Sequence, residues 1–137
     1  MKLFLVEDGS ELVRELWEGD TPVSTAGIGQ TELVCALAAA ARDGRFDAER
    51  LSEDVIDGTF LRERANIVAA DADLLVSASR LGAAHSLRAL DAIHVASALV
   101  LRDVDPIVLS WDDDQRTAAR AEGLRVYPPT ITAVRPP

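Results

Sequence analysis

Residues 87–99 read Leu-Arg-Ala-Leu-Asp-Ala-Ile-His-Val-Ala-Ser-Ala-Leu, an almost entirely apolar run that holds a single carboxylate, Asp91. From residue 90 to residue 101 the apolar side chains surround the helix, and this pattern predicts a helix packed on several sides. Asp91 is therefore expected to be enclosed. A carboxylate that has lost its water needs a cation, a metal ion or several hydrogen-bond donors. The alternative is that Asp91 only caps the first helical turn.

The composition indicates one compact domain with a sizeable core, because 48% of the 137 residues are hydrophobic. No apolar stretch is long enough to cross a bilayer and the first residues lack a signal-peptide pattern, so a cytoplasmic location is expected. The single cysteine, Cys35, lies in an apolar helical pattern and is predicted to fill the core. A net charge of −9 argues against broad electrostatic binding of nucleic acid, so a nucleic-acid substrate would need an intervening cation.

Short apolar runs alternate with longer helical patterns along the chain, which predicts a parallel sheet covered by helices. The expected strands are residues 22–25, 67–69, 106–110 and 125–127. The expected helices run from Ser10 to Gly19, over residues 30–42, from an Asp47 cap to Gly58, from Asp71 towards Gly82, through Asp91, and over residues 114–122. Residues 130–137 are expected to form a tail.

Two further acids stand beside these expected elements. Glu32 opens the helix at residues 30–42, and Asp112 directly follows the strand at residues 106–110. Groups beyond the carboxyl ends of parallel strands converge on one crevice, so Glu32, Asp91 and Asp112 could share a cleft. Close carboxylates repel one another unless a divalent cation lies among them, and oxygen ligands suit Mg²⁺ or Mn²⁺. Such a cluster suits phosphodiester cleavage, whereas each acid taken singly could be a first-turn cap.

Three segments occur in a characteristic order and spacing: Thr31-Glu32-Leu33, Arg88-Ala89-Leu90-Asp91-Ala92-Ile93-His94 followed by Ala96 and Ala98, and Val108-Leu109-Ser110-Trp111-Asp112. Together they resemble the PIN-domain ribonucleases, and among these the VapC-type toxins of bacterial toxin-antitoxin pairs. The resemblance covers nearly the whole chain. It implies a three-layer α/β/α fold with a mostly parallel central sheet, and a metal-dependent endoribonuclease that hydrolyses RNA phosphodiester bonds. The implied partners are RNA, a cognate antitoxin and a second copy in a homodimer.

Site residues follow from this resemblance position by position. Glu32, Asp91 and Asp112 would be the catalytic acids that hold Mg²⁺ or Mn²⁺. Asp114 is an additional acid nearby that could bind water next to the metal. His94, one turn after Asp91, is expected to pack or to form a hydrogen bond instead of ligating. RNA contacts would depend on a few arginines such as Arg88 or Arg116.

The N-terminal segment departs from the family pattern. Family members usually begin with a strand ending in Asp-Thr-Ser-Ala-Leu-Val, whose Asp is the first metal-site acid. By spacing, residues 2–12 match the stretch just after that strand, so this strand and its acid are expected to be missing. Alternatively residues 2–6 occupy the vacant strand position and Asp8 becomes a replacement ligand. A strand that pairs with both Val23 and Val108 would support this second possibility, and a helix would exclude it.

Other classes of protein fit less well. Asp71-Ala72-Asp73 resembles the Asp-x-Asp of haloacid-dehalogenase-like phosphatases, but that chemistry needs a downstream lysine and Lys2 is the only lysine. A receiver-type signalling domain fails for the same reason, and helix capping by Asp71 explains this segment better. The stronger competitor is a catalytically weak or inactive PIN domain that binds an antitoxin or its own partner chain, because losing one ligand loosens a metal site.

Overall fold

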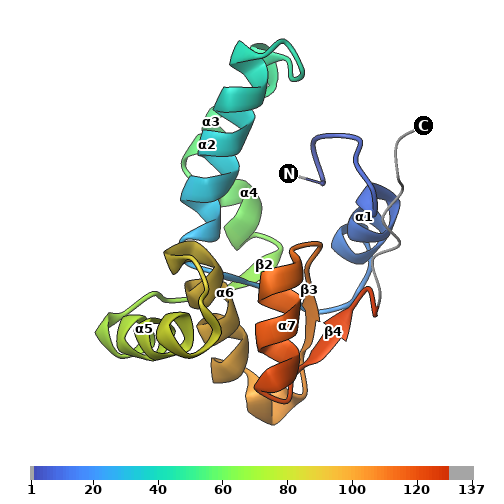
Figure 1. The fold of residues 1–137 in the computed structure, drawn as a ribbon. Coiled ribbons are helices and arrows are strands. Elements are labelled where there is room, and N and C mark those ends of the chain that lie inside the picture. The colour runs from blue at the N-terminus through green and yellow to red at the C-terminus, as the bar shows by residue number, and fades with distance from the viewer. Residues whose placement is uncertain (1, 130–137) are drawn as a thin grey trace, which may run out of the picture. The chain divides into compact units, whose positions relative to one another are not determined.

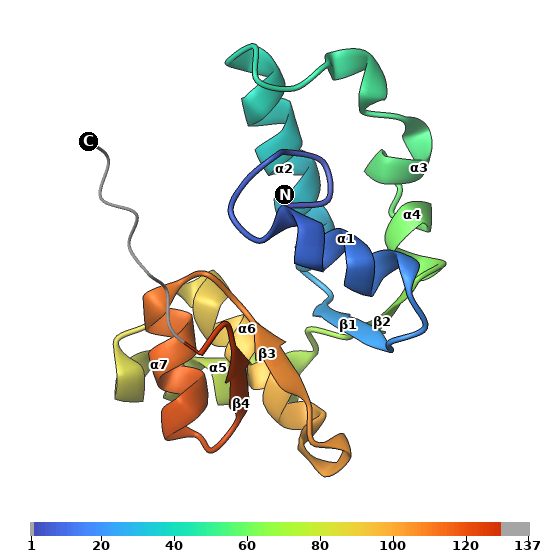
Figure 2. The same ribbon diagram turned by 90° about the vertical axis from the view of Figure 1, so that its right-hand side faces the viewer.

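The computed structural model describes residues 2–129, whose contacts fall into two compact units that divide between Val68 and Ala69. Each unit contains its own helices (Figure 1) and one pair of parallel strands (Figure 2). The tail expected at residues 130–137 lies outside the described part of the chain. No helix within residues 2–129 is long and apolar enough to span a membrane.

The first unit is built around a parallel strand pair and a small hydrophobic core. Its elements are α1 (Ser10–Glu18), β1 (Val23–Ala26), α2 (Gly29–Arg42), the 3₁₀ turn η1 (Ala48–Arg50), α3 (Glu53–Ile56), α4 (Thr59–Arg62) and β2 (Ala65–Val68). β1 and β2 lie side by side, with Val23 opposite Ala65 (Figure 2). The core packs α2 against the segments before and after it, through Leu5, Leu37, Ala40, Phe46 and Val55.

Residues 2–6 form turns and a bend, neither a strand nor a helix. Val23 pairs with Ala65 and Val108 pairs with Val126, and residues 2–6 form no strand that pairs with either, so the structure does not show them in the vacant strand position. Leu5 is instead buried in the core of this unit. Ser10 is the first residue of α1, and the N-cap position belongs to Gly9. The hydroxyl of Ser10 donates to the carbonyl of Leu5 (2.9 Å) and accepts from the backbone N–H of Glu7 (2.9 Å).

The single helix expected between Asp47 and Gly58 is wrong. Asp47 does cap a helical turn, accepting the backbone N–H of Glu49 at 3.0 Å, but this turn is η1 and it ends after three residues. Ser52 then adopts an extended conformation and α3 starts anew. After Gly58, α4 begins with Oδ1 of Asp57 accepting the backbone N–H of Thr59 (2.8 Å), a bond that lowers the pKa of Asp57 below its ordinary value.

The second unit places three helices beside the other strand pair. Its elements are α5 (Ala72–His85), α6 (Ala89–Val100), the 3₁₀ turn η2 (Arg102–Val104), β3 (Ile107–Leu109), α7 (Asp113–Ala121) and β4 (Arg125–Tyr127). α6 contacts both α5 and α7, and α7 lies against β4 (Figure 1). β3 and β4 are parallel, with Leu109 opposite Tyr127. Small and branched side chains fill the interior: Leu74, Ala78, Leu81, Ala92, Val95, Ala96, Ala118, Ala119 and Leu124.

Two burial predictions are wrong. Cys35 is exposed, because the buried residues of α2 are Leu37 and Ala40 and a residue two positions before Leu37 points about 200° away around the helix. α6 is not enclosed on all sides, since Leu90 is 48% and Val100 is 63% exposed. Its buried face is narrower and carries mainly small side chains.

Candidate active site

Asp91 lies in the first turn of α6 and is half-buried instead of fully enclosed. The N-cap position of this helix belongs to Arg88, so Asp91 is not the capping residue. Oδ1 of Asp91 accepts a hydrogen bond from Nε2 of Gln115 on α7, at 2.9 Å. The carboxylate therefore faces a neighbouring helix, in agreement with its need for donors from outside its own turn.

Asp112 stands where β3 gives way to α7. It is exposed and is the N-cap of α7, with Oδ1 accepting the backbone N–H of Gln115 at 2.9 Å. The capping interpretation is thus correct for this acid, which does not prevent a second role. The preceding strand fixes its position, because the backbone N–H of Ser110 donates to the carbonyl of Tyr127 in β4 (3.1 Å).

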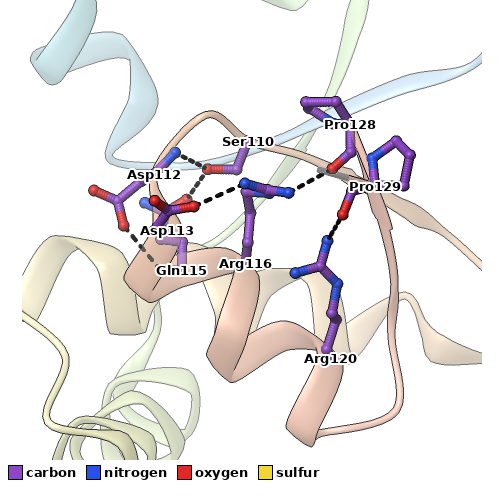
Figure 3. Close-up of polar contacts among 8 residues, drawn as sticks. All are labelled: Ser110, Asp112, Asp113, Gln115, Arg116, Arg120, Pro128 and Pro129. Atoms are coloured by element: carbon purple, nitrogen blue, oxygen red, sulfur yellow. Dashed lines mark hydrogen bonds and ion pairs between the residues drawn. The ribbon is translucent and has the colours of Figure 1, made fainter. Parts of the chain in front are cut away.

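One polar network connects the two acids. The backbone N–H of Asp112 donates to Oγ of Ser110 (3.1 Å), and this hydroxyl donates to Oε1 of Gln115 (3.0 Å), as Figure 3 shows in part. Through its Nε2, Gln115 then reaches Asp91. The second unit therefore brings together two of the three predicted acids, Asp91 and Asp112, although 21 positions separate them in the sequence.

Gln115 was not predicted as a site residue, although its spacing from Asp112 is a recognisable sequence pattern. Asp112 and Gln115 stand at the N-cap and third positions of a helix, the spacing of a capping box, in which the glutamine side chain turns back towards the N-cap. Here the side chain reaches the backbone of Asp112 only through Ser110. Its further contact with α6 could not be read from local spacing.

Glu32 belongs to the first unit, where it is half-buried in the first turn of α2. Its backbone N–H donates to the carbonyl of Ile28 (3.1 Å). Within each unit, no group of three His, Cys, Asp or Glu side chains among residues 2–129 is arranged to hold a metal ion. The membership of Glu32 in the metal site therefore stays a prediction. The same holds for Asp114, which is exposed in the first turn of α7.

Arg116 is buried, with 3% of its surface exposed, so the suggestion that it contacts RNA is wrong. Nη1 donates to Oδ1 of Asp113 and Nη2 to the carbonyl of Pro128, each at 2.8 Å (Figure 3). Arg116 thus connects the start of α7 to the segment that follows β4. Arg88, the other arginine considered, is exposed at the N-cap of α6.

The donor set of the second unit fits a divalent cation. Two carboxylates from different elements are hard oxygen ligands, which suit Mg²⁺ or Mn²⁺ better than softer metals. Each acid uses Oδ1 in the polar network. A neutral amide and a hydroxyl connect them, so the network brings no positive charge that would compete with a cation.

This geometry defines a class of α/β proteins. They have parallel strands, with one acid following β3 and another in the first turn of α6. The PIN domain family model matches residues 1–121. Two proteins of Mycobacterium tuberculosis, "Ribonuclease VapC45" of strain CDC 1551 / Oshkosh and "Ribonuclease VapC49" of strain ATCC 25618 / H37Rv, are each 35% identical to this chain over 128 residues, 93% of this chain and 89% of theirs. No solved structure matches.

The chain therefore belongs to the PIN domain family. This confirms the family and the α/β/α fold class that the sequence predicted. A divalent metal ion is the usual cofactor of this family. The family match thus supports the resemblance from which Glu32, Asp91 and Asp112 were selected. In the second unit one hydrogen-bond network connects two of these acids, Asp91 and Asp112.

Proposed function

We propose that this chain is a metal-dependent endoribonuclease, the toxin of a type II toxin-antitoxin pair that acts in the cytoplasm. The observation that carries the proposal is the joining of Asp91 and Asp112 by one polar network at the β3–α7 junction. The printed names of the two relatives support the reaction, since both are called ribonucleases. The proposed partners are RNA, a cognate antitoxin and a second copy of the chain.

In this proposal Glu32, Asp91 and Asp112 hold Mg²⁺ or Mn²⁺. A bound divalent cation supplies activation of water and neutralises charge that builds on the phosphate. In the reaction an oxygen of water bonds to phosphorus while the bond to the leaving oxygen breaks, and that oxygen takes up a proton. The cation would also allow a chain of net charge −9 to approach a polyanion. Arg88 is exposed three residues before Asp91, and in this proposal it would contact a phosphate of the RNA.

Asp91→Asn tests this proposal, because an amide preserves the shape of the side chain and removes its charge. We expect cleavage of RNA in Mg²⁺ or Mn²⁺ to fall by about 100-fold or more, with an unchanged far-ultraviolet circular dichroism spectrum. Asp73→Asn is the matched control, since Asp73 is an exposed acid in the first turn of α5. RNA cleavage by Asp91→Asn at the rate of the unmodified chain would contradict the proposed role.

A second candidate is an inactive PIN domain that binds an antitoxin or its own partner chain. The turns formed by residues 2–6 favour it, because this segment does not supply a strand that carries the first family acid. Assays of RNA cleavage and Mn²⁺ binding on the unmodified chain distinguish the two candidates. Metal-dependent RNA cleavage supports the nuclease, whereas a folded chain that binds no Mn²⁺ and cleaves no RNA supports the inactive module.

A further inference from the structure

We propose that Gln115 is a positioning residue that fixes the carboxylate of Asp91 relative to Asp112. The inference rests on the proposed function, because it concerns the use of these two acids as ligands. Gln115 contacts both acids with different groups: its backbone N–H binds Asp112 and its side-chain amide binds Asp91, each at 2.9 Å. A single residue thereby sets the start of α7 and the orientation of an acid on α6.

The hydrogen-bond chemistry fixes which way the amide points. An ionised carboxylate can only accept, so the NH₂ group of Gln115 must face Asp91. Oε1 then faces Ser110, whose hydroxyl proton is available because its oxygen already accepts the backbone N–H of Asp112. The four groups form a directed chain from the Asp112 backbone through Ser110 and Gln115 to Asp91. Successive hydrogen bonds of this kind polarise one another, so breaking one weakens the next.

These hydrogen bonds are costly to break because the groups that form them are buried or half-buried. Ser110 is 8% exposed, and Gln115 and Asp91 are half-buried, so water replaces these bonds poorly. Capping of α7 does not need the side chain of Gln115, because the carboxylate of Asp112 caps the helix by accepting the backbone N–H of Gln115. The amide is therefore available for a separate task. It orients Asp91 and adds no charge, whereas an arginine or lysine there would neutralise the carboxylate and repel a cation.

Titration calorimetry with Mn²⁺ on the full chain tests the inference through Gln115→Met, which keeps the length of the side chain and removes both amide contacts. We expect the affinity for Mn²⁺ to fall by about 10-fold to 100-fold, the range typical of residues that orient metal ligands. Thr117→Met is the matched control, since it places the same side chain at an exposed position of the same helix, two residues further on. The control is expected to bind Mn²⁺ like the unmodified chain.

Ser110→Ala provides an independent test, which remains valid if Gln115→Met does not fold. It removes the bond that orients the amide, so we expect weaker Mn²⁺ binding, by a smaller factor than in Gln115→Met. In the double variant the loss should be close to that of Gln115→Met alone, because Ser110 would act through Gln115. A purely structural role would lower the melting temperature and leave the affinity unchanged.

Two results would overturn the inference, and they differ from each other. If the unmodified chain binds Mn²⁺ and Asp91→Asn abolishes binding, but Gln115→Met and Ser110→Ala bind like the unmodified chain, the positioning role is wrong and the proposed function stands. If the unmodified chain binds no Mn²⁺, both fail together.

Discussion

Arg116 and Arg120 lie one turn apart on α7 and bind consecutive carbonyls beyond β4. Nη2 of Arg116 donates to Pro128 and Nη2 of Arg120 donates to Pro129 (Figure 3). The two side chains differ in burial, since Arg116 is 3% exposed whereas Arg120 lies at the surface. Burial decides how much such a bond contributes, because an exposed donor regains water when its partner is lost.

We therefore predict that Arg116→Ala lowers the free energy of unfolding by about 2 to 4 kcal/mol, because it removes buried stem methylenes and leaves the Pro128 carbonyl without its donor. Arg120→Ala should cost less than about 1 kcal/mol. Urea denaturation of both variants measures the difference. Equal losses in the two variants would show that the buried guanidinium contributes no more than the exposed one.

Individual caps were predictable from sequence because they depend on a few neighbouring residues. Asp71 was expected to cap a helix, and its Oδ1 accepts the backbone N–H of Leu74 at 2.9 Å. The contact between Gln115 and Asp91 was not predictable, since it joins residues 24 positions apart on two helices. The burial of Cys35 was predicted wrongly, because apolar residues on all sides of a helix do not reveal which face packs against the core.

At the scale of elements, the strands and long helices were predicted to within a few residues, whereas the segment from Asp47 to Gly58 was not. Long helices carry several turns of periodic pattern. The segment instead contains a three-residue 3₁₀ turn and a four-residue helix, which the extended backbone of Ser52 separates. Leu51 and Val55 still face the core as predicted, because the apolar contacts survive the change in backbone.

Gly58 allows α4 to follow α3 directly. It has a φ of 81°, and a Cβ there would lie 3.0 Å from the amide carbon of Gln30. Gln30 cannot move aside easily, because its Nε2 donates to the carbonyls of Val55 and Ile56 at 2.5 and 2.9 Å. Gly44 also has a positive φ, 69°, but a Cβ there would meet nothing within 4 Å.

These two glycines form a matched pair. Gly44→Ala should cost about 1 to 2 kcal/mol of unfolding free energy, the strain of a left-handed backbone alone. Gly58→Ala should cost roughly 1 kcal/mol or more beyond that, because Gln30 must also be displaced. Thermal or urea denaturation of both variants tests the prediction. A smaller loss for Gly58→Ala than for Gly44→Ala would mean that the crowding around Gly58 is relieved without cost.

For the whole molecule, a single PIN-like domain over residues 1–137 stays a prediction. The family model matches residues 1–121, which include all of the first unit and most of the second. A unit of this size is marginal alone, because a domain of about 60 residues buries only about 60% of the surface of its unfolded chain. The three acids assigned by family position are also divided between the units, with Glu32 in the first and both Asp91 and Asp112 in the second.

We predict that the two units unfold in one transition, and the chain carries a reporter for each. Trp17 stacks on Phe60 in the first unit, with ring centroids 4.9 Å apart, and Trp111 is half-buried between β3 and α7 in the second. Trp17→Phe and Trp111→Phe each leave one fluorescent indole. In each variant the fluorescence midpoint in urea should equal the midpoint of its own far-ultraviolet circular dichroism, which reports all helices. Fluorescence midpoints that differ from the circular dichroism midpoint would show that each unit unfolds independently.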